Sequence, residues 1–510
     1  MQALELVPGK LSIEALQLIH AGKGSLVLSP QAMPCILSSA DTVHRAAIGD
    51  APVYGVNTGF GKLASVKIAA NDLAKLQLNL IRSHSVGVGD PLPPSVVRLM
   101  MALKAASLAR GYSGVRPIII ETLLQAYNLG LVPWVPGQGS VGASGDLAPL
   151  AHMTLALMGE GNMWVDGRAV LAKEVLNAHG IAPLKLAPKE GLALINGTQT
   201  STALALHAWL SFQPVFDAAL VVGALTVDAA RGSDGPFDAR IHALRGQLGQ
   251  IDTAAHYRAF LAGSEIRGSH RVGDDRVQDP YSLRCQPQVM GACLDQLRYA
   301  LEILVREANA VTDNPLVFSA DDELLSGGNF HAEPVALVAD AMAVAIAEVG
   351  AIAERRIAML IDSSVSRLPP FLSSDAGLNS GFMIAHVTAA SLASENKSMA
   401  HPASVDSLPT SANQEDHVSM ATFAARRLMP MIANTGRILA IEWLAAAQGI
   451  DFLRPLKSSS VLERAHAILR SQCASMMTDH HLGPDIEKAY DLLRSGVLAE
   501  LLADFDYLKR

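Results

Sequence analysis

Three small consecutive residues, Ala143, Ser144 and Gly145, have the composition needed to build an electrophile from the backbone itself. Where the chain bends tightly, the Gly145 amide nitrogen can attack the Ala143 carbonyl, because glycine has no side chain to block the approach. Loss of water then closes a five-membered ring, and loss of the Ser144 hydroxyl leaves an exocyclic alkene. The product is a methylidene-imidazolone, an electrophile that no ordinary side chain supplies.

The segment around this tripeptide, residues 139–149, consists mostly of residues with small side chains: seven of its eleven residues are Gly, Ser or Ala. That composition is also typical of a flexible loop leading into a helix, with Asp146 near the helix start. A hydrolase nucleophile would need the pattern G-x-S-x-G, but Asp146 replaces the second glycine. The tripeptide alone is therefore a weak signal, and its weight depends on the rest of the chain.

Residues 139–149 and the Leu-Ala-His-Met run that follows resemble the signature of the aromatic amino acid ammonia-lyases, which carry this self-made prosthetic group. Six further segments resemble the same family, in the same order along the chain. They are residues 54–61, 196–198, 278–284, 313–315, 327–330 and 413–417. The resemblance implies a 4-methylidene-imidazol-5-one (MIO) formed autocatalytically from Ala143, Ser144 and Gly145, with no pyridoxal phosphate and no metal required.

The resemblance also implies roles for single residues. Tyr54 would act as a base on a mobile loop, and Tyr281 would share that role or contact the prosthetic group. Arg284 would clamp the substrate carboxylate, because a planar guanidinium can make two parallel hydrogen bonds to it. Asn196 would hydrogen-bond the new ring or the substrate. The remaining substrate contacts that the resemblance implies are Gln278, Phe330 near the alkene, and Met383 against the substrate ring.

Each of these residues has a simpler alternative. The segment around Tyr54 reads equally as a glycine-rich surface turn, and it does not match a phosphate-binding loop, because Leu63 stands where Ser or Thr should bind magnesium. A single arginine such as Arg284 is more often part of a structural ion pair. Asn196 precedes Gly197, a pair that is typical of a turn.

His84 and Glu415 bear on the choice of substrate. Glu415 lies in the run Gln-Glu-Asp-His, where phenylalanine and tyrosine enzymes of the family resemble Asn-Gln-Asp instead. A carboxylate and a histidine ring can both hydrogen-bond an imidazole, whereas a phenyl ring would leave them unpaired in a closed site. We therefore expect non-oxidative deamination of L-histidine to trans-urocanate and ammonia, the first step of histidine degradation, with Glu415 among the catalytic residues.

Three alternatives stay open at this point. The first is a tyrosine or phenylalanine ammonia-lyase, or an aminomutase, of the same family. The second is a fumarase-aspartase lyase, which shares a helical bundle, although its Gly-Ser-Ser-x-Met-Pro-x-Lys loop is not found here. The third is a helical scaffold without catalytic activity. Separately, His386 stands where relatives carry Gln, which bears on local packing rather than on the chemistry.

Composition narrows the class of protein further. Of the 510 residues, 50% are hydrophobic and 17% are charged, and the formal charge is −8, values that exclude a disordered chain and disfavour nucleic-acid binding. The most apolar stretches, residues 203–230 and 337–361, contain charged residues, which disfavours membrane spans. The four cysteines show no C-x-x-C pair. We expect a cytoplasmic homotetramer whose chains share active sites, as the resemblance implies.

Helical periodicity dominates the sequence. Long helices are predicted over residues 289–311, 337–361 and 415–448, the last with a kink at Pro430, and shorter helices over 71–81 and 97–110. Asp166-Gly167 between apolar residues predicts a hairpin. We expect a mainly α-helical fold: a loop-rich N-terminal domain, residues 1–192, carrying the prosthetic-group loop, and a long-helix bundle of the fumarase/aspartase-like type, residues 193–510.

Overall fold

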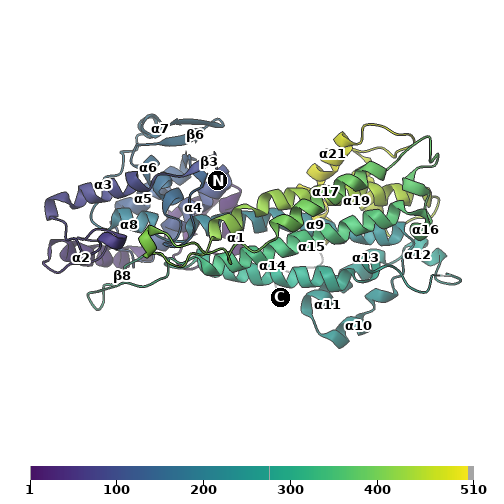
Figure 1. Ribbon diagram of the computed structural model, residues 1–510, viewed down its shortest axis with the longest axis horizontal. Helices are drawn as coiled ribbons and strands as arrows, with labels where there is room; N and C mark the ends of the chain where they lie inside the picture. Colours follow the sequence, from purple (N-terminus) through teal and green to yellow (C-terminus); the bar gives the residue numbers. More distant parts are fainter. Residues whose placement is uncertain (1, 275, 503–510) are drawn as a thin grey trace. The chain divides into compact units, whose positions relative to one another are not determined.

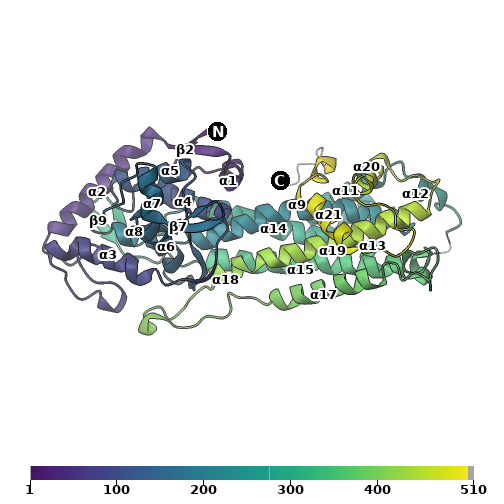
Figure 2. The same ribbon diagram turned by 90° about the horizontal axis from the view of Figure 1, so that it is seen from above.

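The structure of the chain is a computed structural model, which describes residues 2–274 and 276–502 and shows two compact units (Figures 1 and 2). Unit 1 comprises Met1–His207, Leu301–Asp340 and Pro402–Arg426. Unit 2 comprises Ala208–Ala300, Ala341–His401 and Arg427–Arg510. The two domains predicted from the sequence, residues 1–192 and 193–510, are continuous segments, whereas each compact unit combines several segments. The predicted division therefore stays a prediction. The mainly α-helical fold predicted from the sequence is confirmed.

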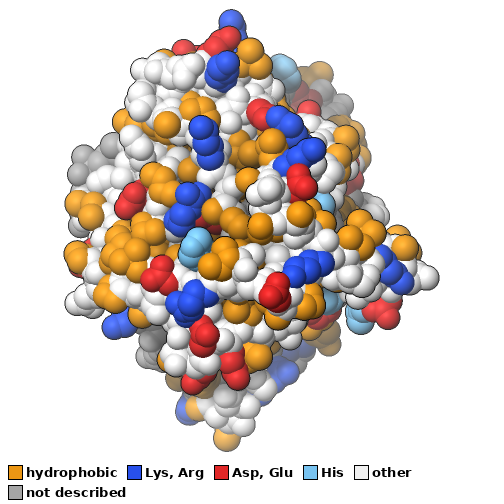
Figure 3. Space-filling view, turned by 90° about the vertical axis from the view of Figure 1, so that its left-hand side faces the viewer, with side chains coloured by type: hydrophobic (Ala, Val, Ile, Leu, Met, Phe, Trp, Pro, Cys, Tyr) orange, Lys and Arg blue, Asp and Glu red, His pale blue; other side chains and the backbone are white. Residues whose placement is uncertain are grey.

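Unit 1 consists of short and medium helices with small sheets between them. On the face shown in Figure 3, Lys and Arg side chains are interspersed with Asp and Glu and with apolar side chains. The helices that belong wholly to unit 1 are α1 (Ile13–His20), α2 (Met33–Ile48), α3 (Leu73–His84), α4 (Pro94–Leu108), α5 (Pro117–Asn128), α6 (Leu147–Leu157), α7 (Ala172–Ala178), α8 (Glu190–Ile195) and α18 (Ala421–Arg426). Thus α3 and α4 confirm the two shorter helices predicted from periodicity.

The strands of unit 1 are short. The hairpin predicted at Asp166-Gly167 is confirmed: both residues have positive φ, 49° and 77°, which is the conformation that a two-residue hairpin turn of type I′ requires. The strands pair as β1 (Gln2–Leu6) with β2 (Gly24–Leu28), β3 (Val88–Pro91) with β5 (Pro136–Gln138), β4 (Val132–Pro133) with β6 (Asn162–Val165) and β7 (Arg168–Leu171), and β8 (Leu316–Phe318) with β9 (Glu323–Leu325).

Unit 2 is a bundle of long helices, several of which run side by side in both ribbon views (Figures 1 and 2). Three helices, α9 (Gln199–Ala229), α14 (Gln286–Ala308) and α15 (Glu333–Ile361), have residues in both units. The others in unit 2 are α10 (Ala239–Arg245), α11 (Leu248–Leu261), α12 (Glu265–Ser269), α13 (Tyr281–Arg284), α16 (Ser363–Ser366), α17 (Met383–Met399), α19 (Leu428–Phe452), α20 (Ser460–Arg470) and α21 (Gly483–Arg494). The helices predicted over residues 289–311 and 337–361 are therefore confirmed.

Buried polar contacts fix the helices of the bundle against one another. The Trp209 indole donates to the Leu297 carbonyl at 2.9 Å, joining α9 to α14. The Thr435 hydroxyl donates to the Ile346 carbonyl at 2.9 Å, joining α19 to α15. Because a buried donor without an acceptor is costly, such contacts favour one register between helices that are otherwise apolar.

The long helix predicted over residues 415–448 is wrong in its first part. Residues 414–420 are not helical: Met420 has φ 56°, and its N–H donates to the Val141 carbonyl at 2.8 Å. The helical part starts with α18 and, after a break at Arg427, continues as α19. Pro430 lies in the first turn of α19 and has no N–H to donate to the Arg426 carbonyl, so the interruption at Arg427 falls where a proline disrupts a helix.

Two helices of the described residues, α9 and α15, are long and apolar enough to cross a membrane by length and composition. Within the apolar window of each helix, 78% and 72% of the residues are buried inside the protein. Core helices of folded domains have the same character, because a helix that is apolar on most sides needs cover on most sides.

The ion pair between Arg356 and Glu442 yields a stability prediction, because both side chains are fully buried and joined at 2.6 and 2.8 Å. Arg356→Met leaves the Glu442 carboxylate with Thr226 as its hydrogen-bond donor. We expect a loss of about 3–5 kcal/mol in the free energy of unfolding, measured by chemical denaturation.

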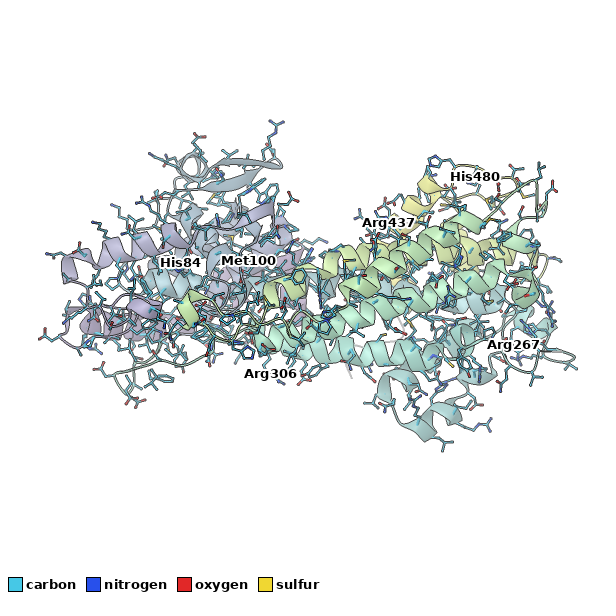
Figure 4. All side chains as sticks on the ribbon, in the orientation of Figure 1. His84, Met100, Arg267, Arg306, Arg437 and His480 are labelled. Atoms are coloured by element: carbon cyan, nitrogen blue, oxygen red, sulfur yellow. The ribbon has the colours of Figure 1, made fainter. Side chains whose placement is uncertain are left out.

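The control is Arg437→Met, which breaks the partly exposed pair with Glu487 on α21 (Figure 4). Exposed pairs contribute about 1 kcal/mol or less, because water and salt screen them. Equal losses in the free energy of unfolding for the two variants would show that the buried ion pair contributes no more to stability than the exposed one.

Candidate active site

Unit 1 contains a cavity of about 1080 Å³ that brings together segments far apart in the sequence. It is bounded by the end of α3, the loop before α6, the end of α8 and two loops, residues 54–68 and 411–417. The residues predicted to be functional that line it are Tyr54, His84, Ala143, Ser144, Asn196, Phe330 and Glu415. A volume of this size is typical of a small-molecule site.

The tripeptide is held in a tight backbone contact at the edge of this cavity. Gly145 has φ 71°, and a Cβ there would lie 2.2 Å from the Gly197 carbonyl oxygen, far inside any permitted contact. The Asp146 N–H donates to that same carbonyl at 2.8 Å. Glycine is therefore required at position 145 for two reasons, the left-handed conformation and the absence of space.

Asp146 ties this loop to the protein around it. Its carboxylate is fully buried and accepts from the Ser140 hydroxyl at 3.0 Å, from the Thr422 hydroxyl at 2.7 Å, and from the Ser201 N–H and hydroxyl at 2.7 and 2.9 Å. Burial raises the pKa of Asp146, and these hydrogen bonds oppose the shift. Four donors satisfy both oxygens, so the carboxylate fixes three segments at once.

Asn196 approaches the tripeptide from the end of α8. Its side-chain Nδ2 donates to the Ser144 carbonyl at 2.7 Å, and the side chain is 3% exposed. Within the described part of the chain its Oδ1 has no hydrogen-bond partner. A buried amide oxygen left free beside a cavity is available to a ligand, because an unpaired buried polar atom is otherwise costly.

Glu415 contacts the same serine from the other side. The Ser144 hydroxyl donates to Glu415 Oε1 at 2.6 Å, and the Thr410 hydroxyl donates to Oε2 at 2.8 Å. The backbones of Thr410 and Glu415 also pair, and the three residues after Thr410 all have positive φ, 52°, 54° and 63°. This turn presents the carboxylate to the cavity in a conformation that non-glycine residues seldom adopt.

His84 is the last residue of α3 (Figure 4). Its Nδ1 lies 2.8 Å from the Leu80 carbonyl, which can only accept, so Nδ1 carries the proton and Nε2 is the acceptor in the neutral ring. Burial lowers the pKa of His84, although the Leu80 carbonyl and the Glu415 charge oppose the shift. At neutral pH the ring is therefore mainly uncharged and offers a hydrogen-bond acceptor at Nε2.

Tyr54 lies half-buried in the loop before Gly61. Its hydroxyl accepts from the Gly61 N–H at 3.4 Å, and its ring packs edge-on against Phe60 at 6.5 Å. Tyr54 also lines the cavity, where a ligand can reach it.

Other predicted residues belong to unit 2 and line a different pocket, of about 470 Å³. Gln278, Tyr281 and Arg284 are among its lining residues. The Arg284 guanidinium carbon lies 4.8 Å from the centre of the Tyr281 ring, and among the described atoms its Nε is buried without a partner. Met383, at the start of α17, lines neither of these two pockets.

Sequence reasoning missed two residues of the unit 1 cavity region. Thr410, which donates to Glu415, lies in a turn whose geometry no local pattern indicates. His331 lines the cavity, and its Nε2 lies 3.1 Å from the carbonyl oxygen of His417, another lining residue. The sequence places His417 in the Gln-Glu-Asp-His motif. Its imidazole ring, which can donate or accept a hydrogen bond, was the available signal that it could line the cavity.

Comparison with known proteins agrees with this arrangement. The family model described as "Aromatic amino acid lyase" matches residues 11–471. A histidine ammonia-lyase of Aromatoleum aromaticum is 58% identical over 98% of this chain and 95% of its own length. The crystal structure of histidine ammonia-lyase from Trypanosoma cruzi is 40% identical, with a TM-score of 0.90, over 99% of this chain and 96% of its own.

A third similar protein is named for a different activity. Tyrosine aminomutase from Streptomyces globisporus is 36% identical, with a TM-score of 0.92, over 99% of each chain. The extent of these matches establishes the relationship: the chain belongs to the aromatic amino acid lyase family.

The contact between Gly145 and Gly197 yields the second prediction. Gly145→Ala forces a side chain into backbone atoms and into positive φ, so we expect a loss of about 2–4 kcal/mol in the free energy of unfolding. Gly61→Ala is the matched control, because Gly61 has φ 54° but nothing within 4 Å of its Cβ position. Its expected loss is about 1 kcal/mol. Thermal unfolding measures the stability of both variants. Equal decreases in melting temperature would mean that the Gly197 backbone moves aside to make room for a Cβ at position 145.

Proposed function

We propose that this protein deaminates L-histidine to trans-urocanate and ammonia without oxidation. The observation that carries the proposal is the meeting of Ser144, Glu415 and His84 at one cavity. A neutral His84 offers an acceptor at Nε2, and Glu415 offers a carboxylate, so either group can accept from the N–H of an imidazole. A phenyl ring would leave both groups unpaired, which disfavours phenylalanine. The histidine ammonia-lyases among the relatives support the same substrate.

We propose further that Ala143, Ser144 and Gly145 form the methylidene-imidazolone group of the family. The residues present fit this group: position 145 admits no side chain, and Asn196 Nδ2 donates to the Ser144 carbonyl, whose oxygen is retained in the ring. Asn196 and Asp146 would hold the group, as they hold the tripeptide. When formed, it supplies an electrophilic alkene, which acid–base side chains lack.

The remaining roles belong to the chain's own side chains. Arg284 binds the substrate carboxylate, because its Nε has no hydrogen-bond partner among the described residues and a guanidinium matches a carboxylate with parallel hydrogen bonds. Gln278 supports that contact from the same pocket. Tyr54 or Tyr281 acts as the base that takes the β-proton. The apolar contacts are Phe330 beside the tripeptide and Met383 against the substrate ring.

Histidine turnover tests the proposal directly. We expect purified protein to form urocanate from L-histidine and to form neither cinnamate from phenylalanine nor coumarate from tyrosine. Ser144→Ala should lower the rate roughly 10³-fold or more, because acid–base groups alone then act. In the wild type, the peptide containing residues 143–145 should be lighter by two waters.

Each contrary outcome has a distinct meaning. Coumarate from tyrosine would favour a tyrosine ammonia-lyase. A β-amino acid from tyrosine would favour an aminomutase, the activity for which one of the similar structures is named. An unmodified peptide mass in active protein would refute the prosthetic group while leaving the substrate intact. A fully active Ser144→Ala variant would also refute the prosthetic group, and wild-type protein that forms no urocanate would refute the proposed substrate.

We propose a homotetramer in which different chains complete each active site. The support is that His84, Ser144 and Glu415 line a pocket of unit 1, whereas Gln278, Tyr281 and Arg284 line a pocket of unit 2. Closed symmetric assemblies of this kind are common among soluble enzymes.

Co-expression of two inactive variants tests this assembly. Ser144→Ala and Arg284→Met should each be inactive alone. When the two are expressed together, some active sites combine an intact Ser144 from the Arg284→Met chain with an intact Arg284 from the Ser144→Ala chain. We therefore expect urocanate formation to return in part. If one chain supplied both halves, the mixture would stay as inactive as either variant, and light scattering would report the size of the assembly in each case.

A further inference from the structure

Lys104 is a fully buried lysine on α4, with 1% of its surface exposed. Its Nζ donates to the Ala193 carbonyl at 3.1 Å and to the Asn196 carbonyl at 2.8 Å. These carbonyls lie at the C-terminal end of α8, where helix carbonyls have no partner within the helix. Lysine is rarely buried this completely, so its presence here calls for a specific role.

The role is not that of an ion pair. The carboxylates that act on Lys104 through charge are Asp313 and Asp146, and each is occupied by other donors: Asp313 by Lys189 and Ser113, Asp146 as described above. Burial lowers the pKa of Lys104 to about 7, with the Lys189 charge adding to the shift and the two carboxylates opposing it. The direct hydrogen-bond partners of Lys104 are therefore the two backbone carbonyls.

Lys104 is joined to the reacting tripeptide through one residue. Asn196 receives the Lys104 hydrogen bond at its backbone carbonyl and passes its own side-chain N–H to the Ser144 carbonyl at 2.7 Å. The next residue, Gly197, packs on Gly145. A shift of the Asn196 backbone would therefore move both the Asn196 side-chain amide and the Gly197 backbone that packs on Gly145.

We propose that Lys104 is a positioning residue: by holding the carbonyls of Ala193 and Asn196 it aims the Asn196 amide at the Ser144 carbonyl. The inference rests on the proposed histidine deamination, which supplies its rate measurement. It assigns to Lys104 no contact with the substrate. Methionine at this position would fill a similar volume but leave both carbonyls without a donor.

The test compares kcat, KM and the mass of the 143–145 peptide in wild type and Lys104→Met. Because misplacement of a supporting group by about 1 Å costs roughly 10²-fold, we expect kcat per modified site to fall roughly 10²-fold. KM should change far less, since neither His84 nor Arg284 contacts Lys104. The peptide mass gives the modified fraction independently of turnover.

A double-mutant cycle with Asn196→Ala separates positioning from general damage. If Lys104 acts through Asn196, Lys104→Met should cause little further loss of kcat in the Asn196→Ala background. Full additivity of the two losses would overturn the proposal. Should Lys104→Met fail to fold, Lys104→Gln, which keeps an N–H donor in a shorter side chain, serves in the same cycle.

Met100→Ala is the matched control for stability, because Met100 is buried on the same helix (Figure 4). It should lower the melting temperature at least as much as Lys104→Met while leaving kcat unchanged. Equal kcat losses in the two variants would assign the effect to the core of α4 rather than to Asn196. Wild-type protein that does not turn over histidine would instead refute the proposed function, and the modified peptide fraction in Lys104→Met, expected to fall, would still test the positioning role.

Discussion

The close approach of the Gly145 and Gly197 backbones is the constraint on which the cavity of unit 1 depends. Neither position accepts a side chain: a Cβ on Gly145 would meet the Gly197 carbonyl at 2.2 Å, and one on Gly197 would meet the Gln199 side chain at 2.5 Å. Both residues have positive φ, 71° and 129°. With the two backbones in contact, the neighbouring Asn196 reaches Ser144, and the surrounding fold holds the tripeptide in this tight turn.

The fold maintains this contact through buried hydrogen bonds rather than through exposed ion pairs. Asp146 joins the loop to Ser201 at the start of α9 and to Thr422 of α18. Lys104 holds the end of α8 from the opposite side. Each of these groups is fully buried and has its donors or acceptors satisfied within the protein. Such a network has few alternative arrangements, because breaking one bond leaves a buried polar group unpaired.

Several polar groups that we propose to face the substrate are left incompletely satisfied by the same fold. Among the described residues, Asn196 Oδ1 and Arg284 Nε lack partners, while His84 presents an acceptor at Nε2. Glu415 is different, because Thr410 and Ser144 already donate to its two oxygens. Binding of the substrate, or dehydration of the tripeptide, would thus replace a hydrogen bond that Glu415 already has. The other three groups would instead gain a hydrogen-bond partner that they lack. This difference is consistent with a catalytic rather than a purely binding role for Glu415.

Local sequence patterns predicted much of the framework. The apolar period identified α14 and α15, and Asp166-Gly167 identified a hairpin whose turn residues need positive φ. The motif segments predicted that Ser144, Asn196 and Glu415 would meet, and the structure brings them together. The same local reasoning extended a helix back to Glu415, where the chain is in fact held by the Val141 carbonyl through Met420.

By itself, therefore, the sequence predicted which residues could carry chemistry and where most of the long helices lie, because residue type and period are local properties. The tertiary structure alone decided that Thr410 orients Glu415 and that Lys104 supports Asn196 from 92 residues away in the chain. Contacts of that kind depend on how distant segments pack, and a buried hydrogen bond between them leaves no periodic trace in either segment.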